Sequence, residues 1–268
     1  MRGGIFLGKM PLGLNLSVTV SYTHLGRDVK RVEAIVAAMR MEGVRLLDWA
    51  MDADLNRAVV TIAGSPAAVV EAAVRGVGKA AELIDLTRQQ GAHPRIGAAD
   101  VIPFVPISGI KLEQCVLLAR QAGLEIWRRY NIPVYFYEAA AARPDRANLD
   151  EVRRGQFEGL RDQVRNDSTR RPDLGGPGLH PTAGACAVGA RKFLVAYNIY
   201  FDSTEVALVR AIAREIRADV YKRQLPRAAA IRMAIRGCAR RYWPRRPKTC
   251  RRRTSSGLFS AARASWRA

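Results

Sequence analysis

The pattern with the clearest chemical potential is a histidine loop that precedes an apolar run. Residues 91–101 read Gly-Ala-His-Pro-Arg-Ile-Gly-Ala-Ala-Asp-Val and contain His93, Arg95 and Asp100. Histidine titrates near neutral pH, so it can both accept and donate a proton. Arg95 offers a planar fork for a carboxylate, and Asp100 can orient a ring nitrogen or a substrate amine. The pattern indicates acid–base catalysis by His93; the alternative is a loop histidine that only hydrogen-bonds its neighbours.

A second irregular segment is rich in glycine and proline. It begins with ten consecutive residues: Pro172, Asp173, Leu174, Gly175, Gly176, Pro177, Gly178, Leu179, His180 and Pro181. Small residues of this kind let backbone amides approach a ligand closely. Neither a Lys-Ser or Lys-Thr pair nor a strand–turn–helix context accompanies the glycines, so neither a P-loop nor a dinucleotide-binding loop is predicted. The segment is either a ligand loop or an interdomain linker.

The elements that must position these loops alternate between strands and helices. Hydrophobic periodicity predicts helices over residues 28–41, 66–84, 112–130, 150–164 and 202–218, and strands over residues 44–48, 57–63, 101–105, 133–137 and 193–201. The alternation predicts a layered α/β or α+β fold. The irregular segments 87–100 and 166–184 are long for a compact domain, and loops of that length are often functional.

The charge of the chain is concentrated at one end. The 268 residues carry a formal net charge of +20, and residues 220–268 hold 15 Lys or Arg with no Asp or Glu. The remaining 219 residues hold 29 basic and 24 acidic side chains. Any binding of a polyanion such as nucleic acid is therefore expected from the tail alone, non-specifically.

Other compositional features narrow the class of protein. The four cysteines form no Cys-x-x-Cys pair and there are three histidines, so no metal site and no disulfide framework is predicted. Reduced thiols fit a cytoplasmic protein. No apolar run approaches the roughly 20 residues of a membrane helix, so no membrane association is expected.

At its two loops the sequence resembles the formiminotransferase family. Separate blocks match in order and spacing over roughly residues 26–219. They are Gly26-Arg27-Asp28, residues 56–61, residues 83–85, the His93 loop through Pro106, residues 132–137, the segment 172–191 and residues 191–198. Several blocks in order are far more specific than any one of them.

The resemblance implies a two-lobed α/β transferase with tetrahydrofolate bound between the lobes. It implies that His93 is catalytic and that residues 172–181 bind folate. The family moves the formimino group of N-formimino-L-glutamate to N5 of tetrahydrofolate, in histidine breakdown, and a homodimer is expected. Residues that can contact the substrate are Asn56, Arg57, Arg95, Asp100 and Arg191. Which arginine pairs with the substrate carboxylates is left open, as is whether Asp100 holds the His93 ring or the reactive amine.

The two ends depart from the family pattern. Of the family's opening strand and its Asn-Ser-Glu-Gly-Arg type of turn only Gly26-Arg27-Asp28 remains, so the first strand is expected to be replaced. The second lobe is cut short where the chain becomes Arg-rich. The strings VSYTHL and DVYKRQ resemble translated sequencing adapters. We expect a non-family start over residues 1–25, a first lobe over 26–181, a partial second lobe over 182–219, and a disordered or artefactual tail over 220–268.

Two further functions fit the same residues. A catalytically incomplete fragment can keep the folate loop without turning over a substrate. A nucleic-acid binder can act through the basic tail, although the rest of the chain is only mildly basic.

Overall fold

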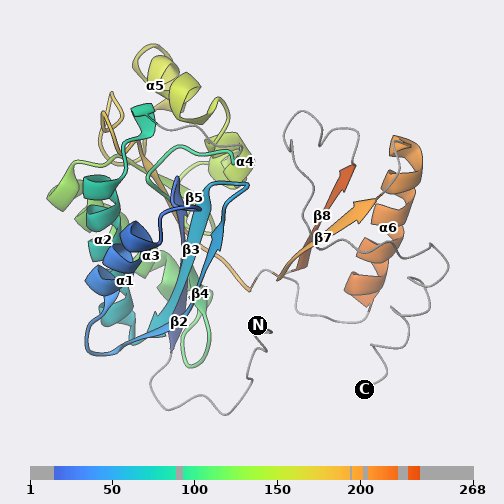
Figure 1. The fold of residues 1–268 in the computed structure, drawn as a ribbon, viewed down its shortest axis with the longest axis horizontal. Coiled ribbons are helices and arrows are strands. Elements are labelled where there is room, and N and C mark those ends of the chain that lie inside the picture. The colour runs from blue at the N-terminus through green and yellow to red at the C-terminus, as the bar shows by residue number, and fades with distance from the viewer. Residues whose placement is uncertain (1–14, 89–92, 194, 202–204, 223–228, 236–268) are drawn as a thin grey trace.

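The computed structural model describes residues 15–88, 93–193, 195–201, 205–222 and 229–235. Figure 1 shows two groups of elements. The first is a six-stranded mixed sheet of spatial order β2-β3-β1-β4-β6-β5, with helices on both faces. The second pairs two parallel strands, β7 and β8, with helix α6. The predicted layered α/β class is confirmed.

The elements have the following bounds. The strands are β1 (Leu16–Thr23), β2 (Val44–Asp52), β3 (Arg57–Gly64), β4 (Ala99–Pro106), β5 (Val134–Glu138), β6 (Cys186–Ala190), β7 (Val195–Phe201) and β8 (Ala229–Ile235). The helices are α1 (Val29–Met39), α2 (Pro66–Leu83), α3 (Leu112–Tyr130), α4 (Leu149–Val152), α5 (Gln156–Asn166) and α6 (Val206–Lys222). Short 3₁₀ turns lie at Leu86–Arg88, Pro144–Arg146 and Ser168–Arg170.

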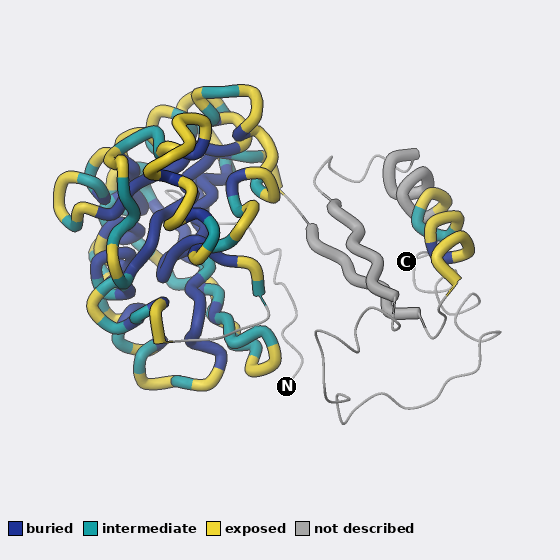
Figure 2. Tube along the Cα trace, turned by 90° about the horizontal axis from the view of Figure 1, so that it is seen from above, coloured by how far each residue is buried: buried dark blue, intermediate teal, exposed yellow. Residues whose placement is uncertain are grey.

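One face of the six-stranded sheet carries the larger hydrophobic core. Successive side chains of a strand point to opposite faces, and Val18, Val20 and Tyr22 of β1 are fully buried on this one. Helices α1, α2 and α3 bury their apolar stripes against it. Figure 2 shows the buried strands inside an exposed shell. This layer fixes the strand ends from which the loops emerge.

The opposite face is covered unevenly. Val152 of α4 and Leu160 of α5 pack with Tyr135 of β5 in a second, smaller core. Towards β1 and β3 the same face becomes polar, and the half-buried hydroxyls of Thr19 and Thr61 lie 3.3 Å apart. The sheet therefore offers a small polar surface beside the region that α4 and α5 cover.

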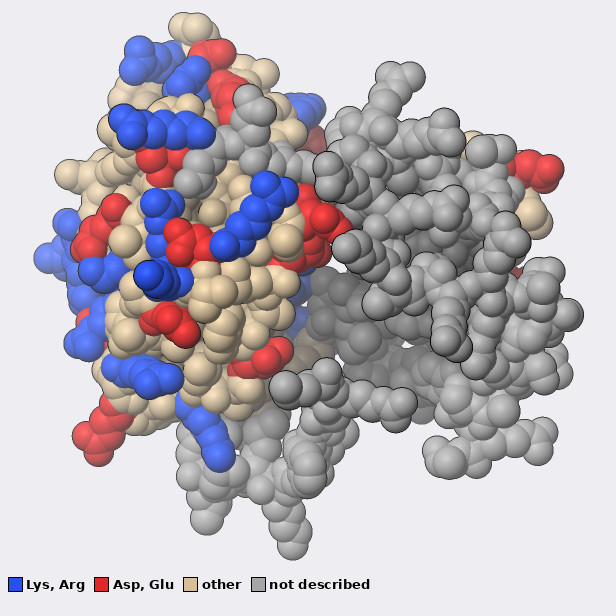
Figure 3. All heavy atoms as spheres, viewed as in Figure 1, with Lys and Arg blue, Asp and Glu red and all other residues tan. Residues whose placement is uncertain are grey.

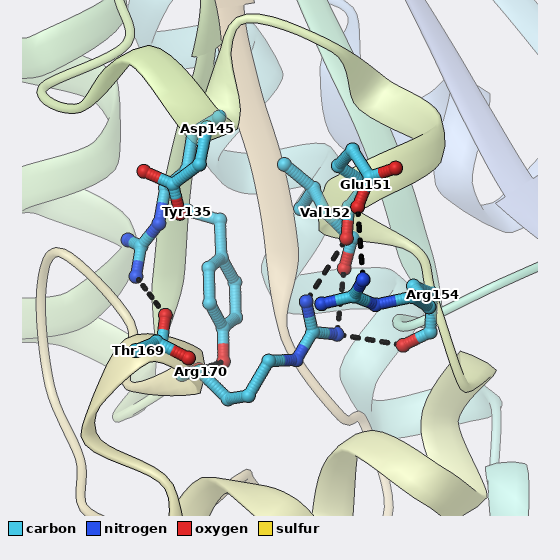
Figure 4. A pocket seen from close by; sticks show the side chains of 8 residues that line it. Tyr135, Asp145, Glu151, Val152, Arg154, Thr169 and Arg170 are labelled. Carbon is cyan, nitrogen blue, oxygen red and sulfur yellow. Dashed lines mark hydrogen bonds and ion pairs between the residues drawn. The ribbon is translucent and has the colours of Figure 1, made fainter.

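A buried arginine ties α4 to its surroundings. The Arg170 guanidinium donates to the carbonyl oxygens of Glu151 in α4 at 2.9 Å and of Arg154, two residues after α4, at 2.6 Å (Figure 4). The Tyr135 hydroxyl donates to the Arg170 carbonyl at 2.7 Å. Since carbonyl groups at a helix end have no partner within the helix, Arg170 satisfies them and holds α4 over β5.

Four elements differ from the sequence prediction. Strand β1 was not predicted, because residues 16–23 belong to the expected non-family start. The helix expected over residues 150–164 is divided into α4 and α5, because Gly155 adopts a positive φ of 84°. Strand β6 was not predicted, since its five small residues are buried on both faces and show no alternation. Strand β8 lies in the tail, for which no strand was predicted.

These elements also bear on the expected segment boundaries. The first sheet begins at Leu16, within the expected non-family start, and it continues through β6 to Ala190, beyond residue 181. Residues 1–14 and 236–268 lie outside the described residues, as do residues 202–204 at the start of the helix predicted over residues 202–218.

The described surface is of mixed charge. Figure 3 shows Lys and Arg interspersed with Asp and Glu on the described face. Cys115 and Cys186 are free and buried. Across the part of the chain that the structure describes, the helices are too short or too polar to cross a membrane.

Candidate functional site

The two loops singled out by the sequence lie side by side. The Ala98 amide donates to the Ala183 carbonyl at 3.0 Å, and the Ala185 amide donates to the Ile96 carbonyl at 2.9 Å. These bonds join the strand-like end of the His93 loop to the residues that follow segment 172–181. The His93 ring is half-buried at the start of this described stretch, and every residue from Arg95 to Asp100 is buried.

Glycine makes this junction sterically feasible. A Cβ on Gly97 would lie 2.0 Å from the Ala185 carbonyl oxygen, and one on Gly184 would lie 2.1 Å from the Ile96 carbonyl oxygen. Gly184 also has a positive φ of 70°, which side chains of L-residues disfavour. The backbones can therefore approach this closely only because both positions lack a side chain.

The end of β1 closes the other side of the His93 loop. The Thr23 hydroxyl donates to the Gly97 carbonyl at 2.8 Å, and the Thr23 amide donates to the Ala98 carbonyl at 3.0 Å. The loop is thus held between β1 and the backbone of residues 183–185.

Asp100 anchors the loop from within. Its carboxylate is fully buried, accepts a hydrogen bond from the Ile96 amide at 2.8 Å and pairs with Arg153. Burial raises the pKa of Asp100 above its ordinary value, and Arg153 opposes that rise. Its hydrogen bonds therefore include the loop backbone and Arg153, which follows α4.

Arg95 is also committed to the protein interior. It is 5% exposed, and its Nε donates to Nε2 of His24 at 2.8 Å. Its terminal nitrogens donate to Gln156 Oε1 at 3.1 Å and to Glu158 Oε1 at 2.6 Å, at the start of α5. The fork that suggested a carboxylate site therefore faces His24 and α5.

Asn56 and Arg57 lie where β2 turns into β3. The Asn56 carbonyl accepts from the His24 amide at 2.6 Å, and Arg57 is opposite Thr23 in the register of β1 and β3. A cavity of about 640 Å³ opens beside them. It is lined by His24, Arg27, Asp28, Val29, Lys30, Arg31, Asn56 and Arg88, four of which are cationic.

Arg191 is separated from this group. Its amide donates to the Phe104 carbonyl at 3.0 Å, near the end of β4, whereas Asp100 is near the beginning of that strand. The structure brings Asn56, Arg57, Arg95 and Asp100 together around the His93 loop, whereas the backbone of Arg191 lies near the opposite end of β4. Burial raises the pKa of Tyr137 of β5, on which the charges of Arg191, Arg153 and Asp100 all act as well.

The first half of segment 172–181 is attached to β5. The Asp173 carboxylate accepts from the Phe136 amide at 2.7 Å and pairs with Arg146 at 2.6 Å. Residues 175–177 are then exposed, and a Cβ on Gly178 would meet no atom within 4 Å. The segment therefore has a fixed base and an open tip.

His180 ends this segment in a tight turn. Its Nδ1 accepts from the Ala183 amide at 3.0 Å, and its backbone exchanges hydrogen bonds with Gly184. Burial lowers the pKa of His180 below its ordinary value, so the neutral ring that can accept this bond is favoured.

Several contributors were not predicted. His24 lies in the expected non-family start, for which no strand was predicted, so no local signal identified it. Gln156, Glu158 and Arg153 were predicted only as members of the helix over residues 150–164. The other three lie 53–63 residues from their partners in sequence, so no local pattern could identify them.

The mixed sheet, its two helical layers and a histidine loop bonded to the end of a glycine-rich loop define an α/β subdomain. The family of the formiminotransferase domain, N-terminal subdomain, matches residues 16–191, from the first residue of β1 to the residue after β6. The chain therefore belongs to the formiminotransferase family, which is a family of transferases.

Relatives with established names support this assignment. The chain is 43% identical over 195 residues to a glutamate formimidoyltransferase of Streptococcus pyogenes serotype M1, covering 72% of this chain and 65% of the relative. It is 42% identical over 196 residues to that of Thermoplasma acidophilum, covering 72% and 64%. It is 39% identical over 181 residues to a formimidoyltransferase-cyclodeaminase of Mus musculus, covering 67% and 33%. The chain thus spans just under two-thirds of the length of the first two relatives.

Proposed function

We propose that this chain carries the catalytic subdomain of a glutamate formimidoyltransferase. The enzyme moves the formimino group of N-formimino-L-glutamate to N5 of tetrahydrofolate, in the breakdown of histidine. His93 is the catalytic residue, and segment 172–181 binds the folate. A homodimer and a cytoplasmic location belong to the same proposal.

The reaction requires a group that first takes a proton and then returns it. His93 accepts the proton that the N5 amine loses as its bond to the formimino carbon forms. His93 then returns that proton to the amine of glutamate as the original carbon–nitrogen bond breaks. An imidazole suits both steps, because its ordinary pKa lies near neutral pH.

The observation that carries the proposal is the backbone junction between the two loops. Hydrogen bonds from Ala98 to Ala183 and from Ala185 to Ile96 place the His93 loop against the end of the glycine-rich segment. The exposed tip at residues 175–177 and the open space at Gly178 leave room for a ligand next to that junction.

The basic cavity that His24 and Asn56 line is suited to bind the substrate's two carboxylates. Its cations are Arg27, Lys30, Arg31 and Arg88, with Asn56 beside them. Arg95 is less suited to this task, since its guanidinium already donates to three side chains.

The test is a transfer assay with N-formimino-L-glutamate and tetrahydrofolate. We expect His93→Ala to lower turnover by about 10²–10⁴-fold, the usual cost of removing a general acid–base. The comparison is made in the full chain and in a chimera whose residues 192–268 are replaced by the corresponding part of the Streptococcus pyogenes relative. Near-parental turnover by His93→Ala in the chimera would show that the assignment is wrong.

A catalytically incomplete folate-binding fragment is the second candidate, because the chain covers only 65% of that relative. It predicts that the 268-residue chain binds 5-formyltetrahydrofolate, measured by calorimetry, while only the chimera turns over. Light scattering on the purified chain tests the homodimer.

A further inference from the structure

Arg95 connects three parts of the fold that are far apart in sequence. It lies two residues after His93, and its side chain reaches His24 at the end of β1 and Gln156 and Glu158 at the start of α5. Arg95 and His24 are both 5% exposed, so the bond between them forms away from bulk water, whereas the Glu158 side chain is 55% exposed. A buried guanidinium with three partners restrains the backbone that carries it.

We propose that Arg95 is a positioning residue for His93, and that its link to the end of β1 persists only while His24 is neutral. The proposal rests on the proposed catalytic role of His93. It differs from the sequence expectation, in which Arg95 was a candidate for binding a substrate carboxylate.

The other contacts that hold the loop all lie further along the chain than Arg95. Asp100 holds the Ile96 amide, and Thr23 holds the carbonyls of Gly97 and Ala98. All of these act after residue 95. Arg95 is therefore the nearest of these anchors to His93 in the chain, and it supplies the restraint on the side of the loop that faces α5.

The chemistry of the His24–Arg95 bond requires a neutral imidazole. A guanidinium can only donate, so Nε2 of His24 must accept, and the ring proton then resides on Nδ1. Nδ1 lies 3.5 Å from the side-chain amide of Asn56, which can present its oxygen as acceptor after a flip. A second proton on the ring would occupy Nε2, replace the acceptor by a donor and place two cations 2.8 Å apart.

The surroundings of His24 favour the neutral form. Burial is the main cause that lowers the pKa of His24, to about 4; the charge of Arg95 lowers it further, and Glu158 opposes this. The cavity beside His24 adds charged groups, namely Arg27, Asp28, Lys30, Arg31 and Arg88, of which four are cations. The bond is thus intact at neutral pH and is lost under acid.

Histidine NMR can test this directly, because the chain has three histidines, His24, His93 and His180. The full chain is labelled with ¹³C-histidine, and the three Cε1–H signals are assigned with single His→Gln variants. Each signal is then followed from pH 8 to pH 3 in the parent, in Arg95→Lys and in His24→Gln. Arg161→Gln is the matched control, since it removes an arginine charge from α5 whose side chain is 51% exposed.

We expect Arg95→Lys to move the His93 signal and its titration midpoint by several tenths of a pH unit, because a lysine cannot reproduce the three-way fork. Arg161→Gln should leave both unchanged. In the parent, a second perturbation of the His93 signal should accompany the protonation of His24. In His24→Gln, whose amide oxygen accepts but does not titrate, that perturbation should be absent.

An unchanged His93 signal in folded Arg95→Lys would overturn the proposal, as would an acid perturbation that persists in His24→Gln. If Arg95→Lys does not fold, Glu158→Gln decides, because it weakens one arm of the fork at a side chain that is 55% exposed. A shift of His93 then supports the proposal and no shift overturns it. None of these readouts uses transfer activity, so failure of the proposed function is detected separately by His93→Ala.

Discussion

The two loops of the candidate site are held in different ways. The His93 loop is buried from Arg95 onward and is bonded to β1, to α5 and to residues 183–185. Segment 172–181 is attached at its base through Asp173, while residues 175–177 are exposed. Proton transfer needs reacting groups at fixed distances, whereas a binding loop needs access to its ligand. The contrast suggests that stability is concentrated at one loop and ligand recognition at the other.

The largest effect is expected when the buried anchor of the His93 loop is removed. In Asp100→Ala, Arg153 keeps its charge without its partner, and breaking a buried ion pair in this way costs about 3–5 kcal/mol. Urea unfolding measures the loss of stability. The control is Asp162→Ala, an acidic side chain on α5 that is 76% exposed. Equal stability of the two variants would mean that Asp100 does not anchor the loop.

The junction glycine should come next. In Gly97→Ala the new Cβ would lie 2.0 Å from the Ala185 carbonyl oxygen, so that carbonyl must move. We expect the free energy of unfolding to fall by about 3 kcal/mol. Gly178→Ala makes the same chemical change in the other loop, where no atom lies within 4 Å. It should alter the free energy of unfolding by less than about 0.5 kcal/mol. Similar losses in both variants would remove the contrast between the loops.

The sequence predicted much of this architecture and both loops. The β-branched run at Arg57–Ala63 and the apolar stripe from Val70 to Ile84 became β3 and α2, because their periodicity is local. Residue type alone singled out His93 and the glycine-rich segment as candidates, and the family resemblance supplied their expected roles. These features depend on near neighbours, which a single sequence displays.

The anchors could not be predicted, because they are tertiary. The partners of Arg95 on α5 are 61 and 63 residues away, and Arg153 is 53 residues from Asp100. Arg95 and Asp100 were selected for their chemical types, but their direction was unknown. In the structure both side chains are buried and bind other groups of the protein.

Acid should weaken the His93 loop through His24. Because the pKa of His24 is lowered to about 4 from an ordinary 6.5, the unfolded chain takes up the proton first as pH falls. The stability contribution is fully present above about pH 6.5 and is lost as pH falls towards about 4, by roughly 2–3 kcal/mol. Urea unfolding at a series of pH values measures this.

The comparison between loops supplies the control for this experiment. In His24→Gln the free energy of unfolding should depend less on pH between pH 6.5 and 4. Burial also lowers the pKa of His180, so His180→Gln should remove only the pH dependence that segment 172–181 contributes. An acid slope that His24→Gln leaves unchanged would assign the effect to other groups.

The smallest effect is expected at the open tip, where it concerns binding and not folding. Gly178 has no neighbour within 4 Å of an added Cβ, and its φ lies outside the left-handed region, so Gly178→Leu should fold normally. If the tip contacts folate, the new side chain occupies ligand space, and affinity for 5-formyltetrahydrofolate should fall about tenfold, which is about 1.4 kcal/mol.

Gly175 is a poorer probe, because its φ is +85° and an added Cβ would lie 2.7 Å from the Trp127 ring. A substitution there disturbs folding and binding together. Calorimetry with the parent and Gly178→Leu, at equal melting temperature, isolates the contact. An unchanged affinity would show that the folate lies elsewhere, and the open tip would then have no part in recognition.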